Sequence, residues 1–287
     1  MHPPTIVAIV GAGTLGGTLA HTLASRDRLD EIRLIDSAGS LAAGKALDIQ
    51  QAGGVEGFRT RITSHTEVTA AAGASVIVVT GPPNAGDDEI EVEAGLRLLE
   101  SLATLDRRAV LVCAGPAHRP LIERAVIEAC IPRRRLIGSA PYAFESSLRA
   151  IVAVELRCPV SQVALTVLGT PPEQTVVPWS QATVRGFAIP QVVDPARLAR
   201  LRDKVGRVWP PGPYALASAA TRVCEAVVDG TDRRGLCCFI TLDGEWGVRL
   251  KVAAFQVELG AYGVSRVLEP VLSVQERVRL ETALQKG

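Results

Sequence analysis

The sequence has no excess of charge of either sign and no long apolar run, and both absences exclude classes of function. Its 287 residues include 31 basic and 30 acidic side chains, so the formal net charge is only +1. A chain without a basic excess is not expected to bind nucleic acid or an anionic membrane. The longest apolar stretches, such as residues 5–10 and 75–80, are far shorter than the ~20 residues of a membrane-spanning helix. They are typical of buried parallel strands.

The cysteines and the first residues also lack recognisable signals. None of the six cysteines forms a C-x-x-C pair or stands at metal-ligand spacing from a histidine, so we expect no metal site. Buried free thiols in a reducing compartment are the simplest interpretation, although the adjacent pair Cys237 and Cys238 has no explanation. The N-terminus lacks the basic and apolar regions of a signal peptide, which predicts a cytoplasmic location.

Short apolar runs alternate with helical patterns over residues 1–140. Expected strands cover residues 5–10, 31–35, 59–64, 75–80, 109–113 and 136–138, and expected helices cover 14–25, 41–51, 87–105 and 120–130. This alternation predicts the α/β class, with a doubly wound parallel sheet of the Rossmann type.

From residue 141 onwards the pattern is different. Strands are expected at 162–168, 181–184, 235–241 and 247–252, and helices at 195–208 and 214–228. A last helix begins with a capping box formed by Ser273 and Glu276. We therefore expect a second, α+β domain over residues 141–287.

The segment after the first strand is the strongest functional motif. Residues 11–16 read G-A-G-T-L-G, directly between a strand and a helix, which is the context that the dinucleotide fingerprint requires. Gly11 would permit the tight turn, Gly13 the approach of the backbone to a pyrophosphate, and Gly16 close packing of helix and sheet. Thr14 and Leu15 complete the turn, and the helix N-terminus would attract the phosphates. A glycine-rich turn without a ligand is the alternative.

An acidic residue follows the fingerprint at the expected distance. Asp36 stands 20 positions after Gly16, at the end of the second strand. Its carboxylate would accept hydrogen bonds from the adenosine ribose and repel a 2′-phosphate, and no arginine follows to receive one. The motif therefore predicts NAD, rather than NADP, as the cofactor.

Segments along nearly the whole chain resemble the lactate/malate dehydrogenase family. They are G-K-A-L-D at 44–48, V-V-T-G at 78–81, L-I-G at 136–138, V-L-G at 167–169, D-G-E-W-G at 243–247, and the glycines at 260 and 263. The resemblance implies a homo-oligomer that transfers hydride between NAD and a 2-hydroxy acid, with Thr80 and Gly81 on the cofactor side. In that family a histidine takes the hydroxyl proton, an aspartate orients it, and an arginine clamps the substrate carboxylate.

The sequence departs from the family at each of these catalytic positions. The histidine falls on Pro171, the aspartate on Phe144 and the carboxylate-binding arginine on Ser147. The asparagine near the nicotinamide falls on Gly115. The loop at 81–86, which in the family is longer and carries arginines, has none here. The resemblance therefore implies a pocket that is more apolar than the family's pocket.

Three residues remain as candidates for catalysis. His118 follows the fifth strand, at the edge where ligands bind in such sheets, whereas Tyr142 and Glu145 lie in the family's catalytic segment. Their structural alternatives are a helix-start residue, a core tyrosine and a surface glutamate.

Three interpretations of function follow. The first is an NAD-binding family member whose hydride-transfer activity is lost or strongly altered, acting as a binding or regulatory subunit. The second is an active NAD-dependent oxidoreductase on a different substrate. The third, an ordinary malate or lactate dehydrogenase, requires the residue matching to be wrong.

Overall fold

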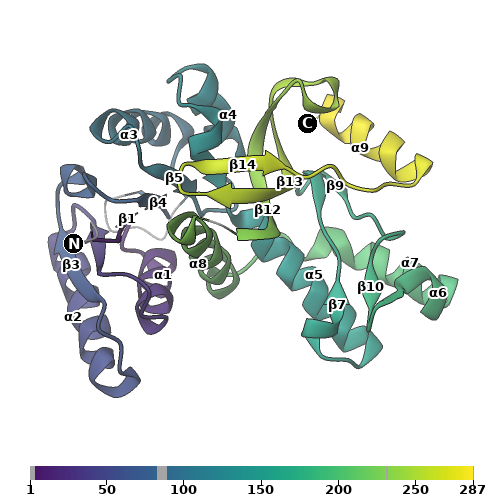
Figure 1. Ribbon diagram of the computed structural model, residues 1–287, viewed down its shortest axis with the longest axis horizontal. Coiled ribbons are helices and arrows are strands. Elements are labelled where there is room, and N and C mark those ends of the chain that lie inside the picture. The colour runs from purple at the N-terminus through teal and green to yellow at the C-terminus, as the bar shows by residue number, and fades with distance from the viewer. Residues whose placement is uncertain (1–3, 83–88, 231, 287) are drawn as a thin grey trace.

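One continuous mixed sheet runs through both halves of the chain in the computed structural model (Figure 1), which describes residues 4–82, 89–230 and 232–286. The strand order is β3-β2-β1-β4-β5-β6-β12-β13-β8-β9, with β14 paired to β13. The first six strands are parallel. They are β1 (Ile6–Val10), β2 (Glu31–Ile35), β3 (Arg61–His65), β4 (Val76–Val79), β5 (Val110–Cys113) and β6 (Leu136–Gly138). The predicted Rossmann-type sheet is confirmed.

Helices cover both faces of the parallel strands, which explains why the central strands β1, β4, β5 and β6 are apolar. Alternate side chains of β1 belong to two core clusters: Ile6, Ala8 and Val10 to one, Val7 and Ile9 to the other. The first cluster includes residues of α3 (Val92–Leu105) and α4 (Arg119–Ile127). The second includes residues of α1 (Thr14–Ser25), α2 (Gly39–Glu56) and α8 (Pro213–Asp229). A strand buried on both faces has no polar alternation.

The second half extends this sheet with antiparallel strands. The long hairpin of β12 (Asp232–Asp243) and β13 (Arg249–Gly260) carries β14 (Gly263–Val267), β8 (Leu168–Thr170) and β9 (Gln174–Val176). It joins the parallel part through one pair of residues, Phe239 of β12 and Gly138 of β6. A small sheet of β7 (Val163–Ala164), β10 (Thr183–Val184) and β11 (Phe187–Ala188) lies apart. The remaining helices are α5 (Ala140–Leu156), α6 (Ile189–Val192), α7 (Pro195–Lys204) and α9 (Val274–Lys286).

Two expectations for the second half were wrong. The single strand expected at 162–168 is divided between β7 and β8, which belong to different sheets. The 17-residue helix α5 was not predicted, because Pro141 was interpreted as a boundary. A proline in the first turn of a helix costs no hydrogen bond, so it is compatible with a helix start. The expected division at residue 140 coincides with the first residue of α5.

The predicted capping box of the last helix is present. The backbone N–H of Ser273 donates to Glu276 Oε2 at 3.0 Å, and the backbone N–H of Glu276 donates to Ser273 Oγ at 3.4 Å. The Glu276 carboxylate also accepts hydrogen bonds from the backbone and the hydroxyl of Ser180. One side chain therefore begins α9 and ties it to the segment after β9.

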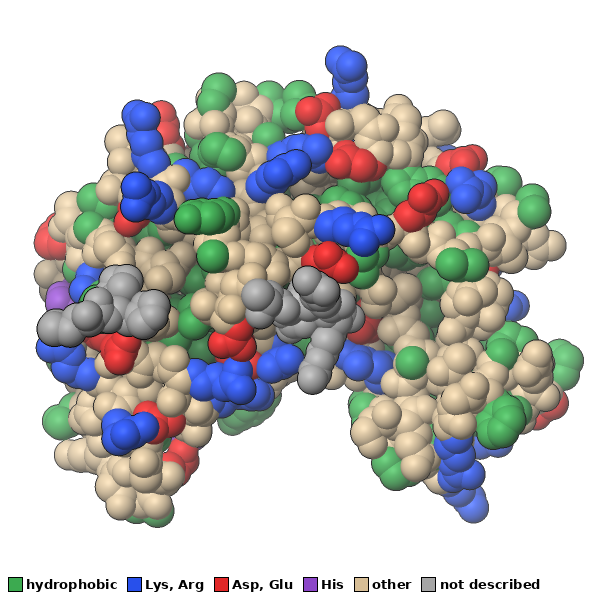
Figure 2. Space-filling view, in the orientation of Figure 1, with side chains coloured by type: hydrophobic (Ala, Val, Ile, Leu, Met, Phe, Trp, Pro, Cys, Tyr) green, Lys and Arg blue, Asp and Glu red, His purple; other side chains and the backbone are tan. Residues whose placement is uncertain are grey.

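The surface agrees with the balanced composition. Acidic and basic side chains are interspersed over the face shown in Figure 2, without a large region of one sign. Among the described residues, no helix has both the length and the apolar character needed to cross a lipid bilayer.

Candidate active site

The glycine turn between β1 and α1 has the conformation that its sequence predicts. Gly11 has a φ of +99°, and a Cβ there would lie 2.9 Å from Thr80 Oγ1. A Cβ on Gly16 would collide with the carbonyl oxygen of Gly11. Gly13 is the N-cap of α1 and has no side chain over the first free N–H groups of the helix. The turn thus leaves the backbone open to an anionic ligand.

Side chains from two other parts of the first half hold this turn in place. The Thr80 hydroxyl, which follows β4, lies 2.9 Å from the carbonyl oxygen of Gly11 and 3.1 Å from that of Val10. Lys45 of α2 donates from Nζ to the Gly13 carbonyl at 2.8 Å. The turn is therefore fixed from both sides before any ligand binds.

Asp36 lies directly behind the turn and is fully buried. Its Oδ2 accepts the backbone N–H of Ala12 at 2.8 Å, and its Oδ1 accepts that of Ala38 at 2.9 Å. A carboxylate oxygen can accept more than one hydrogen bond, and ribose hydroxyls are the donors that the fingerprint predicts for this residue. Contact between Asp36 and a ribose stays a prediction, because the residue does not line the open cleft.

A cleft of about 340 Å³ opens in front of the turn. Six of the predicted cofactor residues line it, namely Gly13, Thr14, Leu15, Gly16, Thr80 and Gly81. The other lining residues are Glu89, Gly115, Pro116, His118, Pro211, Pro213 and Leu216; of these, only Gly115 and His118 were singled out from the sequence. Pro213 and Leu216 belong to the first turn of α8 and Pro211 lies just before it. All three are almost 200 residues from the glycine turn, so no local pattern could have indicated them. Most of the loop at 81–86 lies outside the described residues.

His118 is the one candidate catalytic residue that reaches the cleft. It is the N-cap of α4, and its side chain is 3% exposed. Its Nδ1 accepts the backbone N–H of Gly115 at 3.1 Å, which leaves the ring proton on Nε2. Burial lowers the pKa of His118 to about 4, so the imidazole is neutral at physiological pH.

Glu145 and Tyr142 are not part of this cleft. Glu145, expected as a surface residue if it had no role, is instead buried, with Oε1 3.2 Å from Arg149. Burial raises the pKa of Glu145 to about 7, against the opposing effects of Arg149, Thr166 and the backbone of Val167. The Arg149 guanidinium also lies over the ring of Tyr142, 5.6 Å from its centroid.

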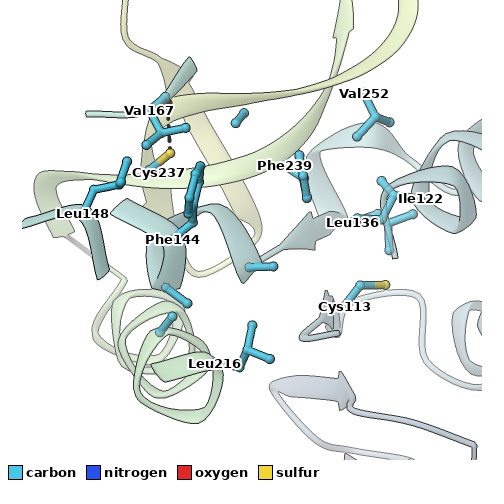
Figure 3. Packing of buried hydrophobic residues seen from close by; sticks show 14 of the residues in the cluster. Cys113, Ile122, Leu136, Phe144, Leu148, Val167, Leu216, Cys237, Phe239 and Val252 are labelled. Atoms are coloured by element: carbon cyan, nitrogen blue, oxygen red, sulfur yellow. Dashed lines mark hydrogen bonds between the residues drawn. The ribbon is translucent and has the colours of Figure 1, made fainter. Parts of the chain in front are cut away.

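An aromatic cluster occupies the segment in which the family resemblance implies a catalytic aspartate. The Phe144 ring of α5 is fully buried and meets Trp209 edge to face, with 5.4 Å between the ring centroids. Trp209 in turn lies 6.3 Å from Phe239 of β12. Figure 3 shows Phe144 beside Leu148 and Cys237, with Phe239 on the neighbouring part of β12. The Phe144 ring therefore lies among apolar side chains and itself has no group that could orient or stabilise a charged imidazole.

Ser147 and Pro171, at the positions where the family resemblance implies the arginine and the histidine, also offer no ionisable group. Ser147 lies on α5, and its hydroxyl donates to the carbonyl of Ala143 within the same helix, at 3.0 Å. Pro171 is buried at the end of β8 and carries no ionisable group. Within the described parts of the chain, no three His, Cys, Asp or Glu side chains are grouped in a way that could hold a metal ion.

Comparison with known proteins identifies the family. Residues 5–88 match the model of the lactate/malate dehydrogenase NAD-binding domain. The malate dehydrogenase of Thermomicrobium roseum is 31% identical over 290 residues, which cover 96% of this chain and 93% of that protein. The chain belongs to the lactate/malate dehydrogenase family. The predicted family and the predicted cofactor, NAD, are confirmed, because the segment with the glycine fingerprint is this family's NAD-binding domain.

Solved structures of the lactate/malate dehydrogenase family have the same architecture. The malate dehydrogenase of Salinibacter ruber superposes with a TM-score of 0.87 at 26% identity, over 97% of this chain and 94% of that chain. The lactate dehydrogenase of Cryptosporidium parvum, solved with lactic acid and nicotinamide adenine dinucleotide, also has a TM-score of 0.87. It is 21% identical, over 100% of this chain and 96% of that one. The fold therefore extends over both halves of the chain.

Proposed function

We propose that this protein binds NAD(H) in the cleft beside the glycine turn but does not reduce 2-oxo acids by the family's mechanism. The observation that carries the proposal is the aromatic cluster of Phe144, Trp209 and Phe239. A proton-donating histidine needs a carboxylate to orient it and to stabilise its charged form. Phe144 supplies neither function, and Pro171 supplies no histidine.

The expected loss of rate is large. Loss of general acid–base catalysis alone costs about 10²- to 10⁴-fold, and loss of a donor to the developing oxygen charge costs about 10²- to 10³-fold. These factors do not simply multiply, because the groups act as a unit. A 2-oxo carboxylate also finds no cation: Glu89 is the only charged side chain among the described residues that line the cleft.

A second candidate is an NAD-dependent oxidoreductase that acts on an uncharged or cationic carbonyl compound. The observation in its favour is the same cleft, which offers the Glu89 carboxylate at its wall and a neutral imidazole at His118. An anionic wall disfavours a carboxylate substrate and favours a cation. The relatives along the whole chain are named malate dehydrogenases, which supports a retained activity in general.

Binding and turnover measurements separate these candidates. NADH at 100 times its dissociation constant should stabilise the fold by about 2.7 kcal/mol, and Asp36→Ala should weaken this effect. We expect NADPH to bind more weakly, because Asp36 repels its 2′-phosphate. The absence of any NADH effect at millimolar concentration would contradict both candidates.

The turnover assay follows NADH oxidation with oxaloacetate, pyruvate, uncharged aldehydes and amino ketones. Binding without turnover supports the first candidate, and turnover confined to uncharged or cationic compounds supports the second. Rapid reduction of oxaloacetate or pyruvate would refute the proposal that the family reaction is lost. A cytoplasmic location stays a prediction from the sequence.

A further inference from the structure

The side chain of His118 occupies the space in which a side chain of residue 115 would begin. A Cβ built on Gly115 would lie 2.5 Å from Nε2, 2.7 Å from Cε1 and 2.8 Å from Cδ2 of His118. Gly115 is the position at which the family resemblance implies an asparagine near the nicotinamide. In this chain the asparagine is absent, and an imidazole from one turn further along the chain fills its place.

The hydrogen bonds of His118 fix which edge of the ring is available to a ligand. Nδ1 is used by the backbone N–H of Gly115 at 3.1 Å, so the ring is neutral and carries its proton on Nε2. Nε2 has no hydrogen-bond partner among the residues that the structure describes. The ring lines the cleft, together with Gly13, Thr80 and Gly81. The cleft is therefore where an acceptor for this N–H group can bind.

The neutral Nε2–H group has the chemistry that an asparagine amide would offer from position 115. Both are uncharged N–H donors, and both stand after the carboxyl end of β5, where ligands bind in doubly wound sheets. An uncharged donor suits an uncharged acceptor oxygen, such as that of an amide or a hydroxyl group. The nicotinamide riboside half of NAD(H) carries both.

We propose that His118 is a positioning residue whose Nε2–H donates a hydrogen bond to an oxygen of the nicotinamide riboside half of NAD(H). The proposal rests on the proposed binding of NAD(H) in this cleft. It assigns to His118 the place of the missing asparagine, and it explains why residue 115 is a glycine, since any side chain there would displace the ring. The donated hydrogen bond orients the nicotinamide end of the dinucleotide.

The test compares NADH with ADP, which lacks the nicotinamide riboside, in the full-length protein. His118→Asn keeps a side-chain acceptor for the Gly115 N–H and a favourable N-cap, but it is too short to present the donor of the ε position. The NADH affinity should fall about two- to twelve-fold, the value of one hydrogen bond, whereas the ADP affinity should not change. His21→Asn is the matched control, because His21 lies on the outside of α1 and pairs with Glu56.

A double variant provides the rescue. His118→Ala removes the ring, and His118→Ala with Gly115→Asn then has room for an amide at position 115. We expect the double variant to recover NADH affinity relative to His118→Ala, a result that a purely structural role of His118 would not produce.

Three outcomes would overturn the proposal: unchanged NADH affinity in His118→Asn, equal weakening of ADP and NADH, or no recovery in the double variant. Failure of the wild-type protein to bind either NADH or ADP would instead refute the proposed function. The two failures are therefore distinguishable.

Discussion

Replacement of Glu145 by glutamine should stabilise the protein at alkaline pH and have little effect at acidic pH. The Glu145 carboxyl is buried on α5, and burial raises its pKa from 4.5 to about 7. At about 1.4 kcal/mol per pH unit, this increase corresponds to about 3 kcal/mol. Between pH 4.5 and 7 the folded state retains a proton that the unfolded state has released, so stability falls as the pH rises through this window. Above pH 7 the Glu145 carboxyl is charged in both states, and the full loss of about 3 kcal/mol of unfolding free energy is present.

Glutamine has nearly the same shape as glutamate and no charge to bury. Arg149, which loses its charged partner, is a quarter exposed at its side chain and can be solvated. Urea unfolding at pH 5 and pH 8.5 measures the effect: the variant should exceed the wild type by up to about 3 kcal/mol at pH 8.5 and by much less at pH 5. Glu281→Gln, on the exposed side of α9, should leave the profile unchanged. A variant that is less stable than the wild type at pH 8.5, or a difference independent of pH, would show that burial does not dominate at Glu145.

Three further predictions concern the cofactor turn, the last helix and assembly. Gly16→Ala should destabilise the fold by about 1–3 kcal/mol and abolish NADH binding, because its Cβ would collide with the Gly11 carbonyl. Gly54→Ala, where a Cβ meets no atom within 4 Å, should instead stabilise the fold by about 0.5–1 kcal/mol. Equal changes of unfolding free energy for the two variants in urea would contradict this reasoning. Glu276→Ala should lower the unfolding free energy by about 1–3 kcal/mol through loss of the capping box and the Ser180 contacts, and an unchanged melting temperature would exclude that role. We also expect a homo-oligomer at micromolar concentration, as the family resemblance implies, and a single 30.3 kDa species in sedimentation would refute it.

Local patterns predicted the first half of the fold well, because short-range physics determines its elements. The helix expected at 14–25 and the strand expected at 31–35 have the same bounds as α1 and β2. The buried residues of α1 recur three and four positions apart, as on one face of a helix, and four of the five residues of β2 are buried. α5 was missed because its first turn contains Pro141, and because its burial depends on contacts with distant elements such as β12 and α8. Contacts with distant elements cannot be read from the local sequence, so nothing there distinguished a helix start at Pro141 from a domain boundary.

The residues of the candidate site also divide into those that local patterns predicted and those that depend on distant contacts. Gly13 and Gly16 were identified because the dinucleotide fingerprint is contained within one strand–turn–helix unit, whereas Thr80 was identified only through the family resemblance of residues 78–81. The position of the His118 ring over Gly115 depends on the backbone conformation of the α4 N-cap, with φ −78° and ψ −1°, which a sequence does not reveal. Leu216 and the prolines before it line the same cleft only because the chain returns to the sheet almost 200 residues later, which a local pattern cannot predict.

The single pairing between Phe239 and Gly138 makes the cofactor-binding half dependent on a strand that is synthesised roughly a hundred residues later. A fragment ending at residue 140 would leave the N–H and C=O groups at the outer edge of β6 without a partner strand, and an open edge of this kind promotes pairing between chains. It would also uncover the face of α1 that packs against α8 and lose the ion pair of Arg26 with Glu225. During translation, the nascent cofactor half would therefore remain prone to aggregation until β12 emerges from the ribosome, and full-length expression should be a condition for obtaining the NAD-binding cleft at all.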